Sequence, residues 1–450
     1  MTDDRATSKA ATKAASKANA KSAWARIKRN LAIILGERAI FAVLNLVSAG
    51  IATRAVGLEV IGAIGLLFAY SRLVSDVLKF NSWQAVLTFG SALKEHGELP
   101  ELRRLIGLSI WVDIGAIVIS LTVAIMGARF FGEWLGWTPE MIAYAPWFCI
   151  IIPFITHMTH VGILRLFDRV GMLAAQHALT AIVRFIGTVA IWYWGGGLLE
   201  LAITWVASAV IAGLAVYVGA WAVAAEHQAL PRMAAAARRG GEGFKGFWRF
   251  MFATSVISTL DKIVVYAATL IVGAVLGPVE AGIFHLVRQI TEAMLRPGDL
   301  LGPLFFPEFA LLEAKGDRRA MRRLVMRAMI YGGLILLAVV GVLVVGGEFI
   351  LVTLFGPETA DGYAILVMAG FAASIFVWGF TLEPVLLSLG QATRTVYGDV
   401  LALITFAGLT WAFVVDLGLV GIGIALIGHR IVQIVWRAAI VLRVLAKSRL

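Results

Sequence analysis

A run of charged residues lies inside an apolar stretch of this chain, where charge is costly. Within GIFHLVRQITEAML, residues 282–295, Arg288 and Glu292 are four residues apart, and Arg296 follows four residues later. Positions spaced by four share one face of a helix. A charged side chain at the centre of a membrane helix costs on the order of 3 kcal/mol, so such groups pair or face water. The spacing therefore predicts a charged stripe that faces a hydrated cavity.

Further ionisable residues are expected near the centres of apolar segments. The basic ones are Arg184, Lys262, Arg288 and Arg430, and the acidic ones are Asp261 and Glu292. Asp261 can pair with Lys262, and Glu292 can pair with Arg288. In one interpretation these pairs are purely structural and hold neighbouring helices together. That pairing leaves Arg184 and Arg430 unmatched. Arginine suits phosphate because its planar guanidinium donates two hydrogen bonds at once, so we expect these cations to hold an anionic group.

A second set of residues consists of candidates for charge balance, for coupling to an ion, or for lining the cavity. Glu383, directly before Pro384, is a candidate carboxylate for charge balance or for a coupling ion, as are Asp261 and Glu292. The remaining candidates are Arg38, Arg72, Asp76 and Arg296. Two histidines in HMTH, residues 157–160, lack further metal ligands nearby, so packing or a proton relay is expected there. We expect no metal, no cofactor and no catalytic residue.

The elements that must position these residues are membrane spans. The chain has 450 residues, is 60% hydrophobic and only 15% charged, and its mean hydropathy is +0.88. That composition predicts an all-α polytopic membrane protein. The apolar runs give about 12 transmembrane helices of roughly 20 residues each, over 31–54, 58–78, 105–127, 141–163, 174–194, 199–224, 250–274, 279–303, 328–347, 363–389, 398–416 and 419–437.

Charge asymmetry predicts the orientation. With both termini in the cytoplasm, most of the 39 Lys and Arg residues fall in cytoplasmic segments, and only Arg54 and Arg129 lie in outer ones. Acidic residues such as Glu133 and Glu358 lie outside. This is the positive-inside pattern of membrane proteins. It also accounts for the net charge of +11 without any nucleic acid partner.

An internal repeat divides the chain. GLEVIG at 57–62 and GPVEAG at 277–282 both join two closely spaced spans, half a chain apart. Six spans in each half predict a parallel repeat, as in several transporter folds. The expected parts are a basic tail over 1–30 that touches anionic lipids, an N-terminal six-helix bundle over 31–230, a basic linker over 231–249, a C-terminal bundle over 250–437 and a cytoplasmic tail over 438–450.

Several classes of protein are excluded. The single cysteine, Cys149, rules out disulfides and cysteine metal clusters. No glycine-rich phosphate loop followed by Lys and Ser or Thr is present, so an ATPase domain is not expected. The expected outer loops are too short to carry the site of a membrane glycosyltransferase. The sequence therefore favours a transporter over an enzyme.

The segment LDKIVVYAATLIVGAVLGPVEAGIFHLVRQI, residues 260–290, resembles the seventh and eighth helices of polysaccharide-export flippases, the O-antigen-type lipid-linked oligosaccharide transporters. The matching positions are Asp261, Lys262, Leu276, Gly277, Ala281, Gly282 and Phe284. FFPEFALLEAKGD at 305–317, LFGPETADGYAILVMAG at 354–370 and RAVGLEVIGAIGLLFAYSRLVSDVL at 54–78 are also similar to segments of that family.

This family belongs to the multidrug/oligosaccharidyl-lipid/polysaccharide (MOP) exporter superfamily. The resemblance implies two six-helix bundles around a central cationic cavity. It implies a flippase in a bacterial inner membrane that moves an isoprenoid-diphosphate-linked oligosaccharide to the outer leaflet for cell-surface polysaccharide biosynthesis, driven by a proton or sodium gradient. Two alternatives stay open: a cation-coupled multidrug exporter of the same superfamily, and a membrane scaffold subunit that gathers glycan-assembly proteins.

Overall fold

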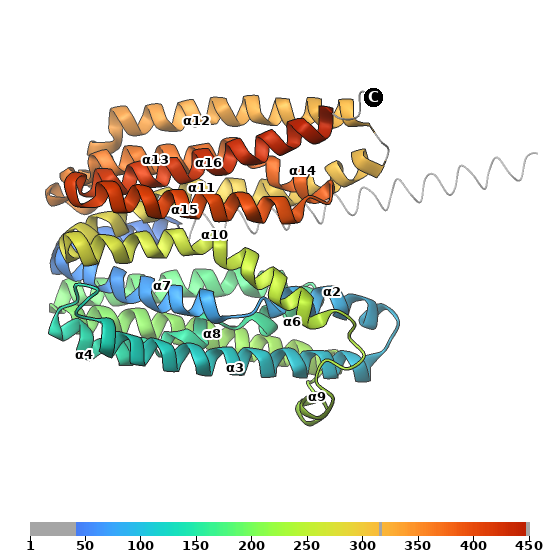
Figure 1. Cartoon of the computed structure of the whole chain (residues 1–450). Helices are drawn as coiled ribbons and strands as arrows, with labels where there is room; N and C mark the ends of the chain where they lie inside the picture. The colour runs from blue at the N-terminus through green and yellow to red at the C-terminus, as the bar shows by residue number, and fades with distance from the viewer. Residues whose placement is uncertain (1–41, 315–316, 447–450) are drawn as a thin grey trace, which may run out of the picture.

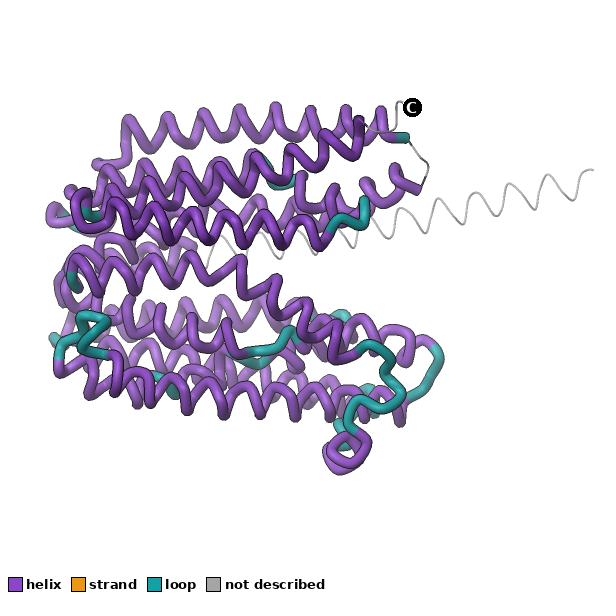
Figure 2. Tube along the Cα trace, in the orientation of Figure 1, coloured by secondary structure: helices purple, strands orange, loops and turns teal. Residues whose placement is uncertain are grey.

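The computed structural model describes residues 42–314 and 317–446, and helices make up nearly all of these ranges (Figures 1 and 2). No strand occurs in them. The first part contains a helical stretch over Ala42–Leu78, then α2 (Ser82–Glu95), α3 (Leu99–Phe131), α4 (Pro139–Phe148), α5 (Ile151–Ile155), α6 (Met158–Leu166), α7 (Val170–Trp194), α8 (Leu198–Glu226) and α9 (Met233–Arg239). The second part contains α10 (Phe247–Leu276), α11 (Pro278–Ala314), α12 (Arg318–Phe355), the 3-10 helix η1 (Pro357–Gly362), α13 (Tyr363–Trp378), α14 (Leu382–Ser388), α15 (Ala392–Leu417) and α16 (Leu419–Ala446).

The Ala42–Leu78 stretch is two spans that turn back on each other at Gly57. Gly57 has a φ of +83°, a left-handed conformation that interrupts a right-handed helix. In one straight helix, Asn45 and Arg72 would lie about 40 Å apart. Both line the same cavity of about 160 Å³. The chain therefore reverses at Gly57, as GLEVIG predicted, and Gly277 with a φ of +107° makes the same turn between α10 and α11.

The expected all-α membrane architecture is confirmed. Within residues 42–314 and 317–446, eight helices are long and apolar enough to cross a membrane, or ten if each of two bent pairs forms one span. The reversal at Gly57 adds one crossing, and α11, which packs along α10 and α13, adds another. The total is the expected twelve. The observed helices exceed the predicted spans at several ends, and α16 continues to Ala446.

Prolines explain two interrupted spans. Pro153 has no N–H to give to the carbonyl of Cys149, four residues earlier, and the helix breaks between α4 and α5 at that point. The two sides of this span meet at 55°. The Cys149 carbonyl accepts from the Ile152 N–H instead, at 2.9 Å, and the Tyr217 hydroxyl donates to the Pro153 carbonyl, at 2.8 Å. Pro384 in α14 likewise follows the break that separates α13 from α14.

Two helices lie where the sequence suggested only connecting segments. The helix α2 packs against α3 and α6, and its buried face includes Ala85 and Val86. The short α9 packs on α3 within the basic linker. Arg104 of α3 also holds this linker in place. Its guanidinium donates hydrogen bonds to the carbonyls of Gly240 and Glu242, and it lies 4.3 Å from the centre of the Phe244 ring.

The two parts of the chain meet tightly at one end of the molecule. Figure 1 shows α11 to α16 above and α2 to α8 below, with α10 between them. The contact is reciprocal: a Cβ on Gly62 would lie 1.7 Å from the Pro278 carbonyl oxygen, and a Cβ on Gly282 would lie 2.3 Å from that of Leu58. Only glycine allows this approach of the two backbones. Arg54 adds two hydrogen bonds to carbonyls at the end of α12.

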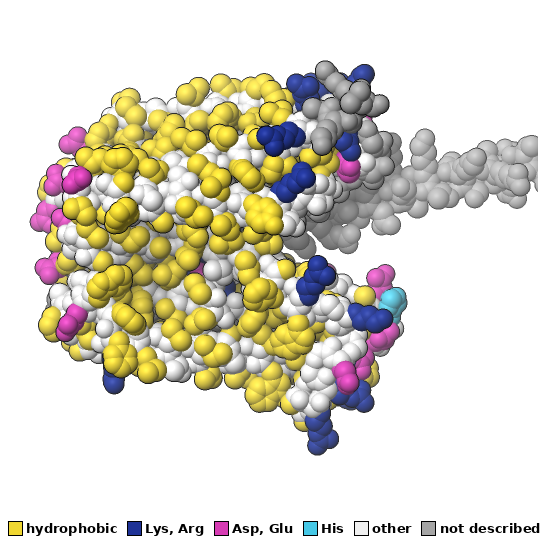
Figure 3. Space-filling view, viewed as in Figure 1, with side chains coloured by type: hydrophobic (Ala, Val, Ile, Leu, Met, Phe, Trp, Pro, Cys, Tyr) yellow, Lys and Arg dark blue, Asp and Glu magenta, His cyan; other side chains and the backbone are white. Residues whose placement is uncertain are grey.

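Charge separates along the length of the molecule. Acidic side chains gather at the end that holds the glycine contact, here called the acidic end, and most Lys and Arg gather at the opposite, basic end (Figure 3). The exposed residues that define the acidic end are Glu133, Glu140, Glu348, Glu358 and Asp361. Those that define the basic end are Arg169, Arg238, Arg239, Lys245 and Arg322. An apolar band lies between the two ends, as a protein that crosses a membrane requires.

Candidate functional site

Three adjoining cavities lie inside the molecule, and Arg184 lines all three. The largest, about 550 Å³, shares Phe68 and Arg72 with one of about 160 Å³. The second shares His285 and Gln289 with the deepest, of about 40 Å³. We call the three together the central cavity. Its volume is in the range of cavities that bind small molecules.

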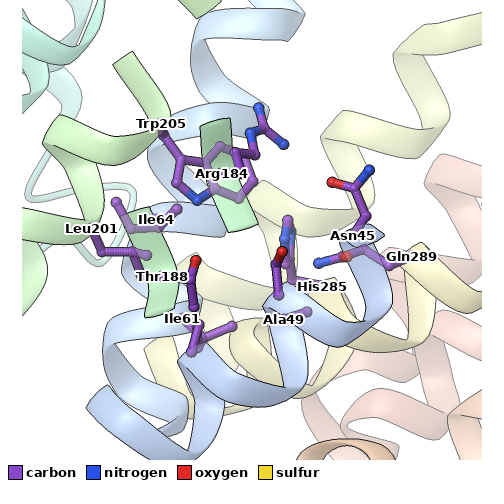
Figure 4. Close-up of a pocket in the computed structure, with 12 residues that line it drawn as sticks. Asn45, Ala49, Ile61, Ile64, Arg184, Thr188, Leu201, Trp205, His285 and Gln289 are labelled. Carbon is purple, nitrogen blue, oxygen red and sulfur yellow. The ribbon is translucent and has the colours of Figure 1, made fainter. Parts of the chain in front are cut away.

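Arg184 of α7 is held by neutral partners. Its guanidinium lies 3.8 Å from the centre of the Trp205 ring, and its Nε donates to Ser208 Oγ at 3.1 Å. No carboxylate within 4 Å pairs with it in the described part of the chain. Figure 4 shows Arg184 and Trp205 beside His285, Gln289 and Asn45 around the deep cavity. A cation stacked on an aromatic ring keeps its charge and its terminal N–H groups available for a ligand.

The largest cavity is strongly basic. Five of its lining side chains are Arg72, Lys79, Arg165, Arg184 and Lys262. No Asp or Glu lines it among the residues whose side chains the structure describes. Asp76 lies just behind this wall and pairs with both Lys79 and Arg72, the latter at 3.8 Å. One carboxylate between two bases leaves a local excess of positive charge, which attracts an anion with several negative charges.

Arg288 and Glu292 form the stripe that their spacing predicts. Arg288 Nη1 lies 3.6 Å from Glu292 Oε1, and both side chains line the middle cavity. The guanidinium of Arg288 also lies 5.3 Å from the centre of the Tyr266 ring. Two of its nitrogens, Nε and Nη1, are buried without a hydrogen bond. Buried donors without a hydrogen bond carry a desolvation cost, which an anion bound beside Arg288 would relieve.

A second charged cluster lies among α14, α15 and α16. Arg437 donates to Glu383 and to Asp399, both at 2.9 Å, and Gln433 donates to Asp399. Arg430 donates to Gln433 at 2.8 Å and lies 4.8 Å from the centre of the Phe376 ring. Arg430 also lines a small cavity of about 70 Å³ with Arg288 and Glu292. Through this small cavity the second cluster therefore adjoins the charged stripe of α11, Arg288 and Glu292.

The structure thus brings together most of the candidates. Arg184, Arg288, Lys262, Arg72 and Glu292 line the central cavity, and Asp76 lies behind its wall. Arg430 and Glu383 belong to the second cluster. Arg38 lies outside the described residues, as do the side chains of Asp261 and Arg296.

Sequence reasoning missed several lining residues. Lys79, Trp205, Tyr266 and His285 contact the candidates directly but carry no distinctive spacing. Asp399 and Arg437 had a usable signal. They lie at the same end of two predicted spans joined by a very short loop, and they have opposite charge.

Comparison with known proteins supports the architecture. No protein-family model matches the chain. It is 27% identical over 353 residues to "Inner membrane protein YghQ" of Escherichia coli strain K12, and the match covers 77% of this chain and 97% of that protein. The fold is similar to that of an inward-facing multidrug resistance MATE family transporter of the MOP superfamily, with a TM-score of 0.73 and 15% identity over 93% of this chain and 99% of the other.

A second similar fold is that of the lipid II flippase MurJ in an inward closed conformation. Its TM-score is 0.66, with 13% identity over 91% of this chain and 86% of that protein. An outward-facing MATE transporter of the MOP superfamily gives a TM-score of only 0.53. The chain therefore has the fold shared by MATE transporters and MurJ.

Proposed function

We propose that this protein is a flippase that moves an isoprenoid-diphosphate-linked oligosaccharide from the cytoplasmic to the outer leaflet of a bacterial inner membrane. One observation carries the proposal: five basic side chains and no described carboxylate line the largest cavity. A diphosphate is the anionic part of such a lipid, and arginine binds phosphate through two parallel hydrogen bonds. Arg184, Lys262 and Arg288 hold the diphosphate, and Arg430 reaches it through the neighbouring small cavity.

We extend the proposal to the remaining parts of the cycle. The basic end faces the cytoplasm, because positive residues favour that side, so both termini are cytoplasmic. The cavity loads from this end and releases after the acidic end has parted, as in alternating access. Asp261, Glu292 and Glu383 balance charge or carry the coupling proton or sodium ion. The product supplies cell-surface polysaccharide biosynthesis, where glycan-assembly proteins are the expected partners.

A multidrug exporter on the same fold is the rival function. The similarity to a MATE transporter favours it. Cationic drugs, however, bind best where negative charge or open aromatic faces meet them. In this cavity Arg184 lies over the ring of Trp205 and Arg288 over that of Tyr266, so a cationic drug would meet an arginine at each of these rings.

The test is a flipping assay in proteoliposomes. An isoprenoid-diphosphate oligosaccharide is incorporated, and its exposure to an added glycan-binding protein is followed for the wild type, Arg184→Ala and Arg129→Ala. Arg129 is exposed and lines none of these cavities, so it is the matched control. A hydrogen bond to a charged group is worth about 1.5–3 kcal/mol, so Arg184→Ala should slow flipping roughly 10- to 150-fold. Absence of flipping by the wild type under either ion gradient, with export of a cationic dye instead, would establish the exporter.

A further inference from the structure

An apolar groove lies on the outer surface, on the other side of α10 from the central cavity. Its volume is about 360 Å³, and its walls come from α3, α10 and the end of the Ala42–Leu78 stretch. Ile119, Phe252 and Val256 at its rim are 54%, 66% and 38% exposed. These residues lie in the apolar band, so the groove is a hollow that faces the hydrocarbon of the membrane.

The groove and the central cavity are separated by a thin wall. Lys79 lines both of them. A short connecting loop, residues 79–81, follows Leu78 and leads into α2. This loop is fixed to α10 by hydrogen bonds from Asn81 to Ser255 Oγ and to the Thr254 carbonyl, at 3.0 and 2.7 Å.

Neighbouring faces of α10 line the two spaces. Ser255 and Thr259 face the groove, whereas Ser258 and Lys262 face the cavity. The helix bends by 43° at this level, between Leu260 and Lys262. The basic cavity and the apolar groove therefore lie on neighbouring sides of the same helix, α10.

We infer that the groove between α3 and α10 binds the isoprenoid chain of the substrate while its diphosphate lies on the cavity side of Lys79. This inference rests on the proposed function. An isoprenoid diphosphate has an apolar chain directly joined to an anionic diphosphate. The apolar groove suits the chain, the basic cavity suits the diphosphate, and Lys79 lines both spaces. An apolar chain left in the groove stays within the hydrocarbon layer and avoids the cost of entering the hydrated cavity.

The experiment is photo-crosslinking in nanodiscs with the full chain. The probe is an isoprenoid-diphosphate disaccharide with a diazirine in its chain, and labelled peptides are mapped by mass spectrometry. We expect labelling of 116–119 and 252–260 that falls at least about fivefold with excess unlabelled isoprenoid diphosphate. Ile119→Trp fills the rim of the groove and should lower that labelling about tenfold. Ile114→Trp changes an exposed residue on another face of α3 and should leave it unchanged.

Three results would overturn the inference. If a phospholipid with a diazirine in its acyl chain labels the groove equally, and isoprenoid diphosphate does not compete, the groove is an ordinary lipid contact. If the isoprenoid probe labels other surfaces while flipping continues, the chain lies elsewhere and the proposed function stands. If flipping and competed labelling are both absent, the proposed function fails together with the inference.

Discussion

The reciprocal glycine contact at the acidic end gives a sharp prediction about alternating access. Gly62 and Gly282 lie in the two halves of the repeat, and each faces a backbone carbonyl of the other half. The contact joins the two parts of the chain at the acidic end, and under the proposed alternating access this end must part for release. Any side chain at either position should therefore favour states in which this end is open.

The size of the effect follows from the geometry. In Gly62→Ala the new Cβ lies 1.7 Å from the Pro278 oxygen, whereas ordinary contact needs at least 3.4 Å, and the backbone carbonyl cannot rotate away. Overpacking of this kind costs about 1–3 kcal/mol. Because the strain exists only while the end is closed, the ratio of open to closed molecules should rise roughly 5- to 150-fold.

The assay is a pair of spin labels across the acidic end, with distances measured by pulsed electron paramagnetic resonance in nanodiscs. Cysteines replace the exposed Glu133 and Glu358, and the buried Cys149 becomes alanine. Gly62→Ala should add a population at longer distance. Gly115→Ala is the control, because a Cβ there meets nothing within 4 Å.

Gly282→Ala tests the reciprocity and should shift the same distances in the same direction as Gly62→Ala. If both variants keep the helical circular dichroism of the wild type and also its distance distribution, the glycine contact does not hold this end closed. The close approach of the two backbones would then have no part in opening or closing the acidic end.

Two further predictions concern charged residues away from the central cavity. Arg437→Ala leaves the buried carboxylate of Asp399 without its ion pair, which should destabilise the protein by about 3–5 kcal/mol, seen as a lower melting temperature in nanodiscs. Adding Asp399→Asn should recover part of that loss, and no recovery would mean that the pair itself is not the cause. Arg104→Ala removes two hydrogen bonds to the linker, so trypsin should cleave after Arg238 and Arg239 several times faster, whereas an unchanged rate would show that other contacts hold the linker.

The order of the spans could be predicted from the sequence because a crossing helix needs a long apolar run that hydropathy alone reveals. The turns at Gly57 and Gly277 were predictable because two similar glycine motifs sit half a chain apart. The helix α2 could not be predicted from the sequence, because its 14 residues are too few to cross a membrane and it ends in Lys94 and Glu95. Its helical state depends on packing against α3 and α6, which no local pattern contains.

The stripe of Arg288 and Glu292 was predictable for a similar reason, since both lie on one helix and their spacing fixes their shared face. Of the two partners of Arg437, Asp399 has the signal described above, whereas Glu383 has none, because its helix is not joined to that of Arg437 by a short loop. A charge that pairs across helices leaves no periodic signal in the sequence. The same holds for Trp205, whose ring supports Arg184 from a neighbouring helix.

The two halves repeat their helices and their glycine turns but not their charges. In the C-terminal half, Arg437 meets two carboxylates and Arg288 meets Glu292. In the N-terminal half, Arg72 and Lys79 share Asp76, and Arg184 rests on a tryptophan and a serine. The backbone contact between the halves requires the repeated glycines, whereas nothing in the packing requires the surplus cations. The surplus lies around the largest cavity, which Arg184 of the N-terminal half and Lys262 of the C-terminal half both line, so an anion bound there should be held by cations of both halves.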